Sequence, residues 1–146
     1  MHGRIARVAV PCVATYVIAI MAGWLQPAII EGLRHGLAMS QASAGEVAGA
    51  EVAAVGIGSM LIGARLHRIG FRLRTLGIGA CCLIALGNLL SIVTDWIGLL
   101  LLGRAITGVG QAIAFATATN ILATRIPTGR MGRVIAGYTL SEGLIV

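Results

Sequence analysis

Residues 8–30 read VAVPCVATYVIAIMAGWLQPAII, a run of 23 positions without a charged side chain. A helix needs about 20 mainly apolar residues to cross a bilayer, so this run is long enough to span one. We therefore expect an all-α protein, a polytopic membrane helix bundle that forms a single transmembrane domain over residues 1–146. Four later runs are similarly apolar, and the further expected spans are 47–64, 76–94, 96–124 and a partial one over 134–146.

The composition excludes the usual soluble classes of protein. Hydrophobic residues make up 58% of the chain and charged residues 11%, and the mean hydropathy is +0.94. A soluble domain carries about 25% charged residues, and a chain this short cannot bury so much apolar surface. The sequence also contains no nucleophile–base pair, no phosphate-binding glycine loop and no cysteine spacing typical of a metal site. We therefore expect no enzymatic activity, no metal and no cofactor.

The charged residues indicate the orientation of the chain in the lipid bilayer. If the N-terminus is cytoplasmic, the inner segments hold nine arginines and no acid, whereas the outer segments hold one arginine and three acids. Cytoplasmic loops of membrane proteins carry an excess of basic residues. We therefore interpret the net charge of +6 as a topology signal and not as a nucleic-acid surface, in a multi-pass protein of the cell (inner) membrane.

The outer connection and the loop before the fourth span also carry local signals. Ser43, with Glu46 three residues later, predicts a capping box that opens the second helix. The short turn at residues 94–96 predicts that the third and fourth spans are adjacent and antiparallel. Asn88 and Ser91, on the third span, are expected to bond to neighbouring helices.

The loop between the second and third expected spans has a more specific pattern, GARLHRIGFRLR over residues 63–74. Its spacing resembles the signature loop of the major facilitator superfamily, which lies between the same two helices. In that family an acidic residue at the position of His67 belongs to a charge network that latches the two halves of the transporter in the outward-facing state. A histidine cannot supply a permanent negative charge, so the chain departs from the family there. The residues that match the loop are Gly63, Arg68, Gly70 and Arg72.

The fourth expected span resembles the same family, in which an arginine on the fourth helix precedes a glycine-rich stretch. Here residues 102–112 read LGRAITGVGQA. A cation inside a span costs about 2.5–3.5 kcal/mol on insertion scales and is usually functional. We assign Arg104, Gly108 and Gly110 to transport or gating. Thr107 and Gln111 share a helix face with Arg104, and we expect them to line a cavity. On the first span, Gln26 is expected either to line the cavity or to take part in ordinary helix packing.

Arg104 needs an acidic partner inside the membrane, and the spans hold two acids, Glu51 and Glu142. With a rise of 1.5 Å per residue, the offset along the membrane normal is about 4 Å to Glu51 and about 8 Å to Glu142. We therefore predict an Arg104–Glu51 ion pair, with Glu142 facing the cavity or another helix.

The resemblance implies a twelve-helix transporter with two six-helix halves, of which this chain supplies about four and a half helices of the N-terminal half. The resemblance favours secondary active transport of a small organic solute of unknown identity. We expect the transport to be coupled to protons, and efflux is one of the two directions in which it could run. Because alternating access needs a second half, we expect transport to require a missing C-terminal half or a partner chain. The alternatives are a short membrane subunit for interaction or assembly, and a small multidrug exporter, which the absence of an acid in the first span disfavours.

The orientation is testable with reporter fusions. A fusion at Leu73 should remain in the cytoplasm and a fusion at Met39 should be translocated, because arginines flank the first site and acids flank the second. Alkaline phosphatase, which is active only when exported, measures both. A translocated Leu73 fusion would contradict the predicted topology.

Overall fold

The computed structural model describes residues 14–21, 23–65, 73–125, 132 and 136. No strand occurs among these residues, and the expected all-α membrane bundle is confirmed. Residues 14–21 are helical and precede α2. The helices that follow are α2 (Gln26–Gly36), α3 (Gln41–Arg65), α4 (Leu73–Ile92) and α5 (Ile97–Arg125).

Four of the described segments are long and apolar enough to cross a membrane. They correspond in order to the first four spans expected from the sequence, whereas residues 137–146 lie outside the described part of the chain. The four segments are Ala14–Gly36, Gln41–Arg65, Arg74–Ile92 and Ile97–Thr124.

The second span begins earlier than the sequence predicts. Helix α3 starts at Gln41, because the Ser40 hydroxyl oxygen accepts a hydrogen bond at 3.1 Å from the backbone N–H of Ser43. This is the geometry of an N-cap, in which a side-chain oxygen satisfies one of the free N–H groups of the first turn. The predicted cap at Ser43 is therefore wrong, and Ser43 lies inside the first turn.

The first span is interrupted near its middle. Leu25 forms a turn between the helical residues 23–24 and α2, and Pro27 stands at the start of α2. Proline has no backbone N–H, so it cannot donate the helical hydrogen bond to the carbonyl of Gly23, four residues earlier. The chain compensates with bonds on either side of this position: Leu25 N–H donates to Met21 O at 3.1 Å, and Ile29 N–H donates to Leu25 O at 2.8 Å.

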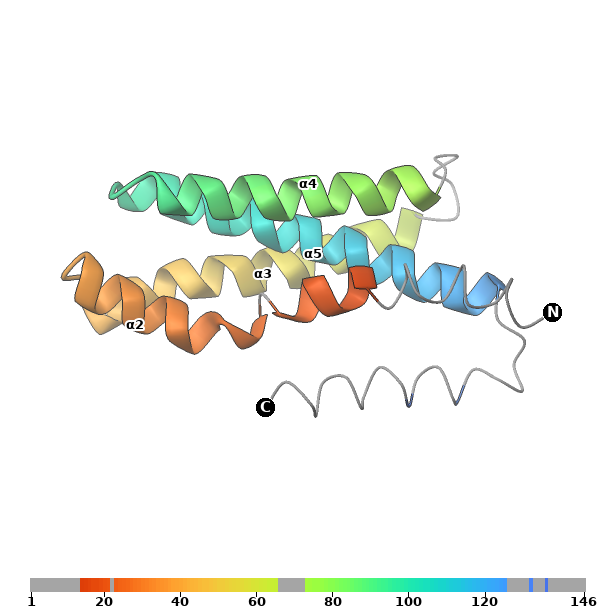
Figure 1. Cartoon of the computed structure of the whole chain (residues 1–146), viewed down its shortest axis with the longest axis horizontal. Coiled ribbons are helices and arrows are strands. Elements are labelled where there is room, and N and C mark those ends of the chain that lie inside the picture. Colours follow the sequence, from red (N-terminus) through yellow and green to blue (C-terminus); the bar gives the residue numbers. More distant parts are fainter. Residues whose placement is uncertain (1–13, 22, 66–72, 126–131, 133–135, 137–146) are drawn as a thin grey trace.

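Helix α5 is the central element of the bundle (Figure 1). It packs along both α3 and α4, and α2 packs on α3. Half of the α5 span is buried, against 17% of the α3 and α4 spans. Large apolar side chains such as Met60 and Ile92 are exposed on the outside of the bundle, as expected for lipid-facing positions. The buried apolar side chains are mostly small, and the alanines among them are Ala19, Ala44, Ala48, Ala80, Ala112, Ala114 and Ala118.

Glycines on α5 allow this close packing on two sides. A Cβ atom at Gly108 would contact the carbonyl oxygen of Glu51 and lie 2.8 Å from the Cβ of Ala54, both on α3. A Cβ atom at Gly110 would lie 2.9 Å from the carbonyl oxygen of Ala80 on α4. The structure therefore places both glycines at helix crossings, where small residues let two backbones approach.

The α2–α3 connection and the α4–α5 turn lie at the same end of the bundle (Figure 1). A surface hollow at this end is lined by residues 36–39 together with Ser43 and residues 95–97. The α4–α5 turn joins two adjacent antiparallel helices, as predicted. Arginines mark the other end, at the end of α3, the start of α4 and the end of α5: Arg65, Arg74 and Arg125.

The packing of α5 on α3 predicts a position-specific effect of adding a methyl group. Gly108→Ala should lower the free energy of unfolding by about 1–3 kcal/mol, because its Cβ has no room against α3. The matched control is Gly49→Ala on α3, whose Cβ would have no neighbour within 4 Å and which should not destabilise the protein. Unfolding of both variants in detergent micelles, followed by circular dichroism, measures the difference; equal stabilities would contradict the predicted crossing.

Candidate functional site

The guanidinium of Arg104 lies inside the bundle, between α3 and α4. Its Nη1 donates a hydrogen bond to Glu51 Oε2 at 3.1 Å, and its Nη2 donates to Asn88 Oδ1 at 3.3 Å. Arg104 is 6% exposed and Glu51 is 1% exposed. The structure thus brings together the two charges that their depth in the membrane predicts to pair, and it adds a third partner from α4.

Asn88 is held in a fixed orientation toward Arg104. Its Nδ2 donates to the carbonyl oxygen of Ile84 at 2.8 Å, which leaves Oδ1 to accept from the guanidinium. The prediction that Asn88 bonds a neighbouring helix therefore agrees with the structure. The same prediction for Ser91 does not, because its hydroxyl donates to the carbonyl oxygen of Gly87 on its own helix at 2.9 Å.

Gln111 completes the set of partners around Glu51. Its Nε2 donates to Glu51 Oε1 at 2.5 Å, so each carboxylate oxygen accepts a hydrogen bond from a different side chain of α5. An ionised carboxylate is an acceptor at both oxygens, and this arrangement suits that form. We call the four side chains Asn88, Arg104, Glu51 and Gln111 the buried polar network.

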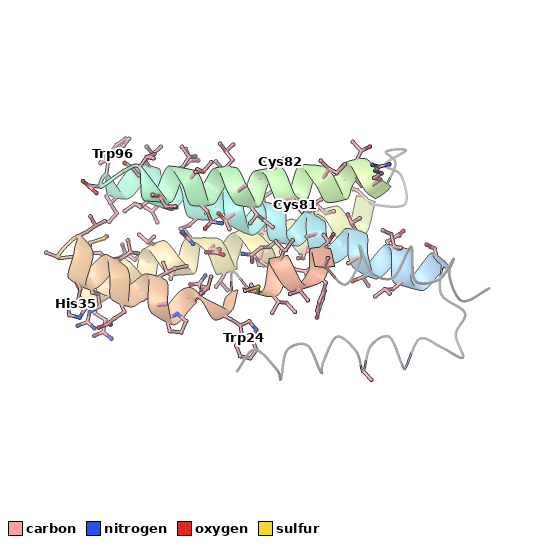
Figure 2. The ribbon with its side chains drawn as sticks, in the orientation of Figure 1. Trp24, His35, Cys81, Cys82 and Trp96 are labelled. Carbon is pink, nitrogen blue, oxygen red and sulfur yellow. The ribbon has the colours of Figure 1, made fainter. Side chains whose placement is uncertain are left out.

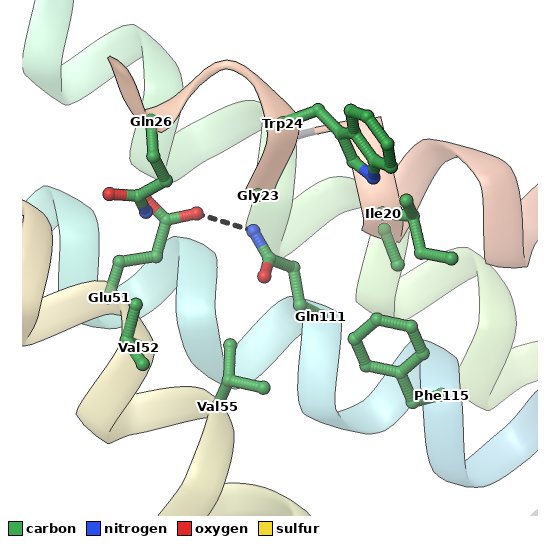
Figure 3. A pocket seen from close by; sticks show the side chains of 10 residues that line it. Ile20, Gly23, Trp24, Gln26, Glu51, Val52, Val55, Gln111 and Phe115 are labelled. Carbon is green, nitrogen blue, oxygen red and sulfur yellow. Dashed lines mark hydrogen bonds between the residues drawn. The ribbon is translucent and has the colours of Figure 1, made fainter. Parts of the chain in front are cut away.

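A cavity of about 490 Å³ lies beside this network, between the first span, α3 and α5 (Figure 3). Glu51 and Gln111 of the network line it, whereas Arg104 and Asn88 do not. Its walls are largely apolar, and it has the size of sites that hold small molecules. The lining residues are Ala19, Ile20, Gly23, Trp24, Gln26, Glu51, Val52, Val55, Gln111 and Phe115.

The structure separates the residues that were expected to share the cavity. Gln26 and Gln111 line it. Thr107 does not line the cavity. It is fully buried, and its hydroxyl donates a hydrogen bond to the carbonyl oxygen of Gly103 at 3.0 Å. It packs against Gly87 of α4, so closely that a Cβ atom at Gly87 would clash with the Thr107 hydroxyl. The helix face that contains Arg104 is divided between α4 and the cavity, and Thr107 lies on the α4 side.

The remaining predicted site residues lie elsewhere or outside the described part of the chain. Gly63 is an exposed residue near the end of α3, and a Cβ there would have no neighbour within 4 Å. The residues outside the described ranges are His67, Arg68, Gly70, Arg72 and Glu142.

Sequence analysis missed two features of the site. Asn88 was expected to bond a neighbouring helix, but Arg104 was not predicted as its partner. The aromatic residues Trp24 and Phe115 were not assigned to the cavity. The contact between Asn88 and Arg104 could have been predicted, because Asn88 is an amide inside a span and Arg104 lies on the adjacent antiparallel helix. Among the described residues, no group of three or more His, Cys, Asp or Glu side chains is placed to hold a metal ion.

Helices long and apolar enough to span a membrane, with a buried ion pair beside a cavity of this size, define a multi-pass helical membrane protein with a candidate solute site. A family model described as Major Facilitator Superfamily matches residues 12–146. The chain therefore belongs to the major facilitator superfamily, whose members are transporters and not enzymes. No curated protein and no solved structure matches the chain significantly.

A double-mutant cycle tests the ion pair. Arg104→Ala leaves the Glu51 carboxylate buried, with Gln111 as its one remaining donor among the described residues, and should lower the free energy of unfolding by about 3 kcal/mol or more. Adding Glu51→Gln to Arg104→Ala should recover part of this loss, because it removes the unpaired charge. Unfolding in detergent micelles measures all four proteins.

The matched control is the exposed ion pair between Arg34 and Glu31 on α2, whose N–O distance is 3.3 Å. The same cycle on that pair should give a coupling of about 1 kcal/mol or less, because solvent screens it. If the effects of Arg104→Ala and Glu51→Gln are strictly additive, the pairing is wrong.

Proposed function

We propose that this chain forms part of the N-terminal half of a proton-coupled secondary transporter of a small organic solute. The observation that carries the proposal is the position of Glu51, which contacts Arg104 and Gln111 and also lines the cavity. A titratable group that touches both a buried cation and a solute site is suited to link proton binding to solute binding.

The contacts of Glu51 suggest how such a link operates. A proton on the carboxylate cancels the charge that holds Arg104, and leaves the guanidinium with Asn88 as its remaining partner. The interaction between α3 and α5 at this depth is thereby weakened. Any movement of α3 against α5 then depends on the protonation of Glu51, and a solute that contacts Glu51 or Gln111 from the cavity biases the same equilibrium.

The proposed transport also needs a second unit of helices. The described helices α3, α4 and α5 are tied together by the buried polar network, so we propose that they move as one unit while the Arg104–Glu51 pair is intact. Alternating access is the rocking of one such unit against another around a shared site. We propose that a C-terminal half or a partner chain supplies the second unit, in a cell (inner) membrane with the N-terminus in the cytoplasm.

Two reconstitutions test this proposal. The 146-residue chain alone, in vesicles that enclose a pH-sensitive dye, should show no saturable solute flux and no solute-driven pH change. When the chain is joined to the rest of the N-terminal half and to a second six-helix unit, solute addition should produce a pH change, and Glu51→Gln should abolish it. The control Glu46→Gln, an exposed residue in the first turns of α3, should leave the pH change intact. Saturable uptake by the chain alone would contradict the need for a second unit.

A further inference from the structure

The orientation of the buried ion pair relative to the cavity indicates which charge a solute in the cavity would carry. Glu51 lines the cavity, whereas Arg104 lies behind it and is held on the far side by Asn88 of α4. The negative end of the pair therefore faces the cavity. No other charged side chain of the described residues lines it. The electrostatic potential in the cavity consequently favours a cation over an anion.

The walls of the cavity are suited to an apolar body. Ile20, Val52 and Val55 supply aliphatic surface, and Trp24 and Phe115 supply two aromatic rings (Figure 3). The ring of Phe115 is set by an edge-to-face contact with Tyr16, with ring centroids 5.4 Å apart. Aromatic faces attract cations as well as apolar groups. Two amides, Gln26 and Gln111, add polar side chains to the lining.

We propose that the cavity selects an amphipathic solute with one positive charge and an apolar or aromatic body. The inference rests on the proposed transport function and names its substrate class. Glu51 is only 1% exposed, so the cation does not replace Arg104 but lies near the carboxylate and the two amides. Since the guanidinium partly cancels the field of the carboxylate, the preference for a cation over a neutral solute of equal shape is about tenfold.

The two tryptophans of the chain provide a reporter and its control. Trp24 lines the cavity, and Trp96 lies in the α4–α5 turn, where it is 70% exposed (Figure 2). In the Trp96→Phe variant, fluorescence reports on the cavity. In the Trp24→Phe variant, fluorescence reports unspecific partitioning of a probe into the detergent.

The experiment titrates the 146-residue chain in micelles with three probes that share a phenyl body: 2-phenylethylammonium, 2-phenylethanol and 3-phenylpropanoate. Excitation at a wavelength absorbed by tryptophan alone avoids the probes. The ammonium probe should quench Trp24 saturably and bind about tenfold more tightly than the alcohol, and the carboxylate should bind most weakly. Trp96 should show no saturable quenching by any probe.

Glu51→Gln should reduce the affinity for the ammonium probe below that for the alcohol, because the charge of Arg104 is then uncompensated. Glu46→Gln should leave the preference unchanged. Retained binding of the alcohol shows that the cavity of the Glu51→Gln variant is intact; if that variant does not fold, the ranking of the three probes on the parent protein decides the question. Equal binding of all three probes, or tighter binding of the carboxylate, overturns the inference and leaves the transport proposal standing. Absence of saturable quenching by every probe counts against both.

Discussion

A guanidinium group inside a membrane-spanning helix must find partners inside the protein, and this requirement organises the structure around Arg104. The group has donors on more than one side, so a single carboxylate does not use them all. Here α3 supplies Glu51 and α4 supplies Asn88, while α5 carries Arg104 itself. Three helices are thereby tied together at one depth, and the charge is satisfied without contact with the lipid.

The small residues of α5 make these contacts geometrically possible. Gly108 brings α5 close to the backbone of α3 at Glu51, and Gly110 brings it close to α4 at Ala80. Side chains on three helices then come within hydrogen-bonding distance of one another. The glycines and the polar residues are therefore parts of one arrangement: close backbones allow the polar contacts, and the polar contacts fix which faces of the helices meet.

The features that the sequence predicts well are those that depend on position along the membrane normal. The order of the spans and the meeting of Arg104 with Glu51 follow from lengths and from the rise per residue. The features that it misses depend on rotation about the helix axis and on which neighbour occupies each face. Thr107 and Gln111 share a broad helix face with Arg104, yet α4 covers Thr107 and the cavity borders Gln111. The sequence pattern of one helix does not indicate which of its faces a neighbouring helix covers.

The break in the first span has a consequence for the main-chain hydrogen-bonding groups beside the cavity. Because Pro27 has no N–H, the carbonyl oxygen of Gly23 lacks the donor that an unbroken helix would give it. Gly23 lines the cavity. An acceptor of this kind belongs to the main chain, so no exchange of the side chains around the cavity removes it. The free acceptor at Gly23 then depends on Pro27, four positions further along the chain.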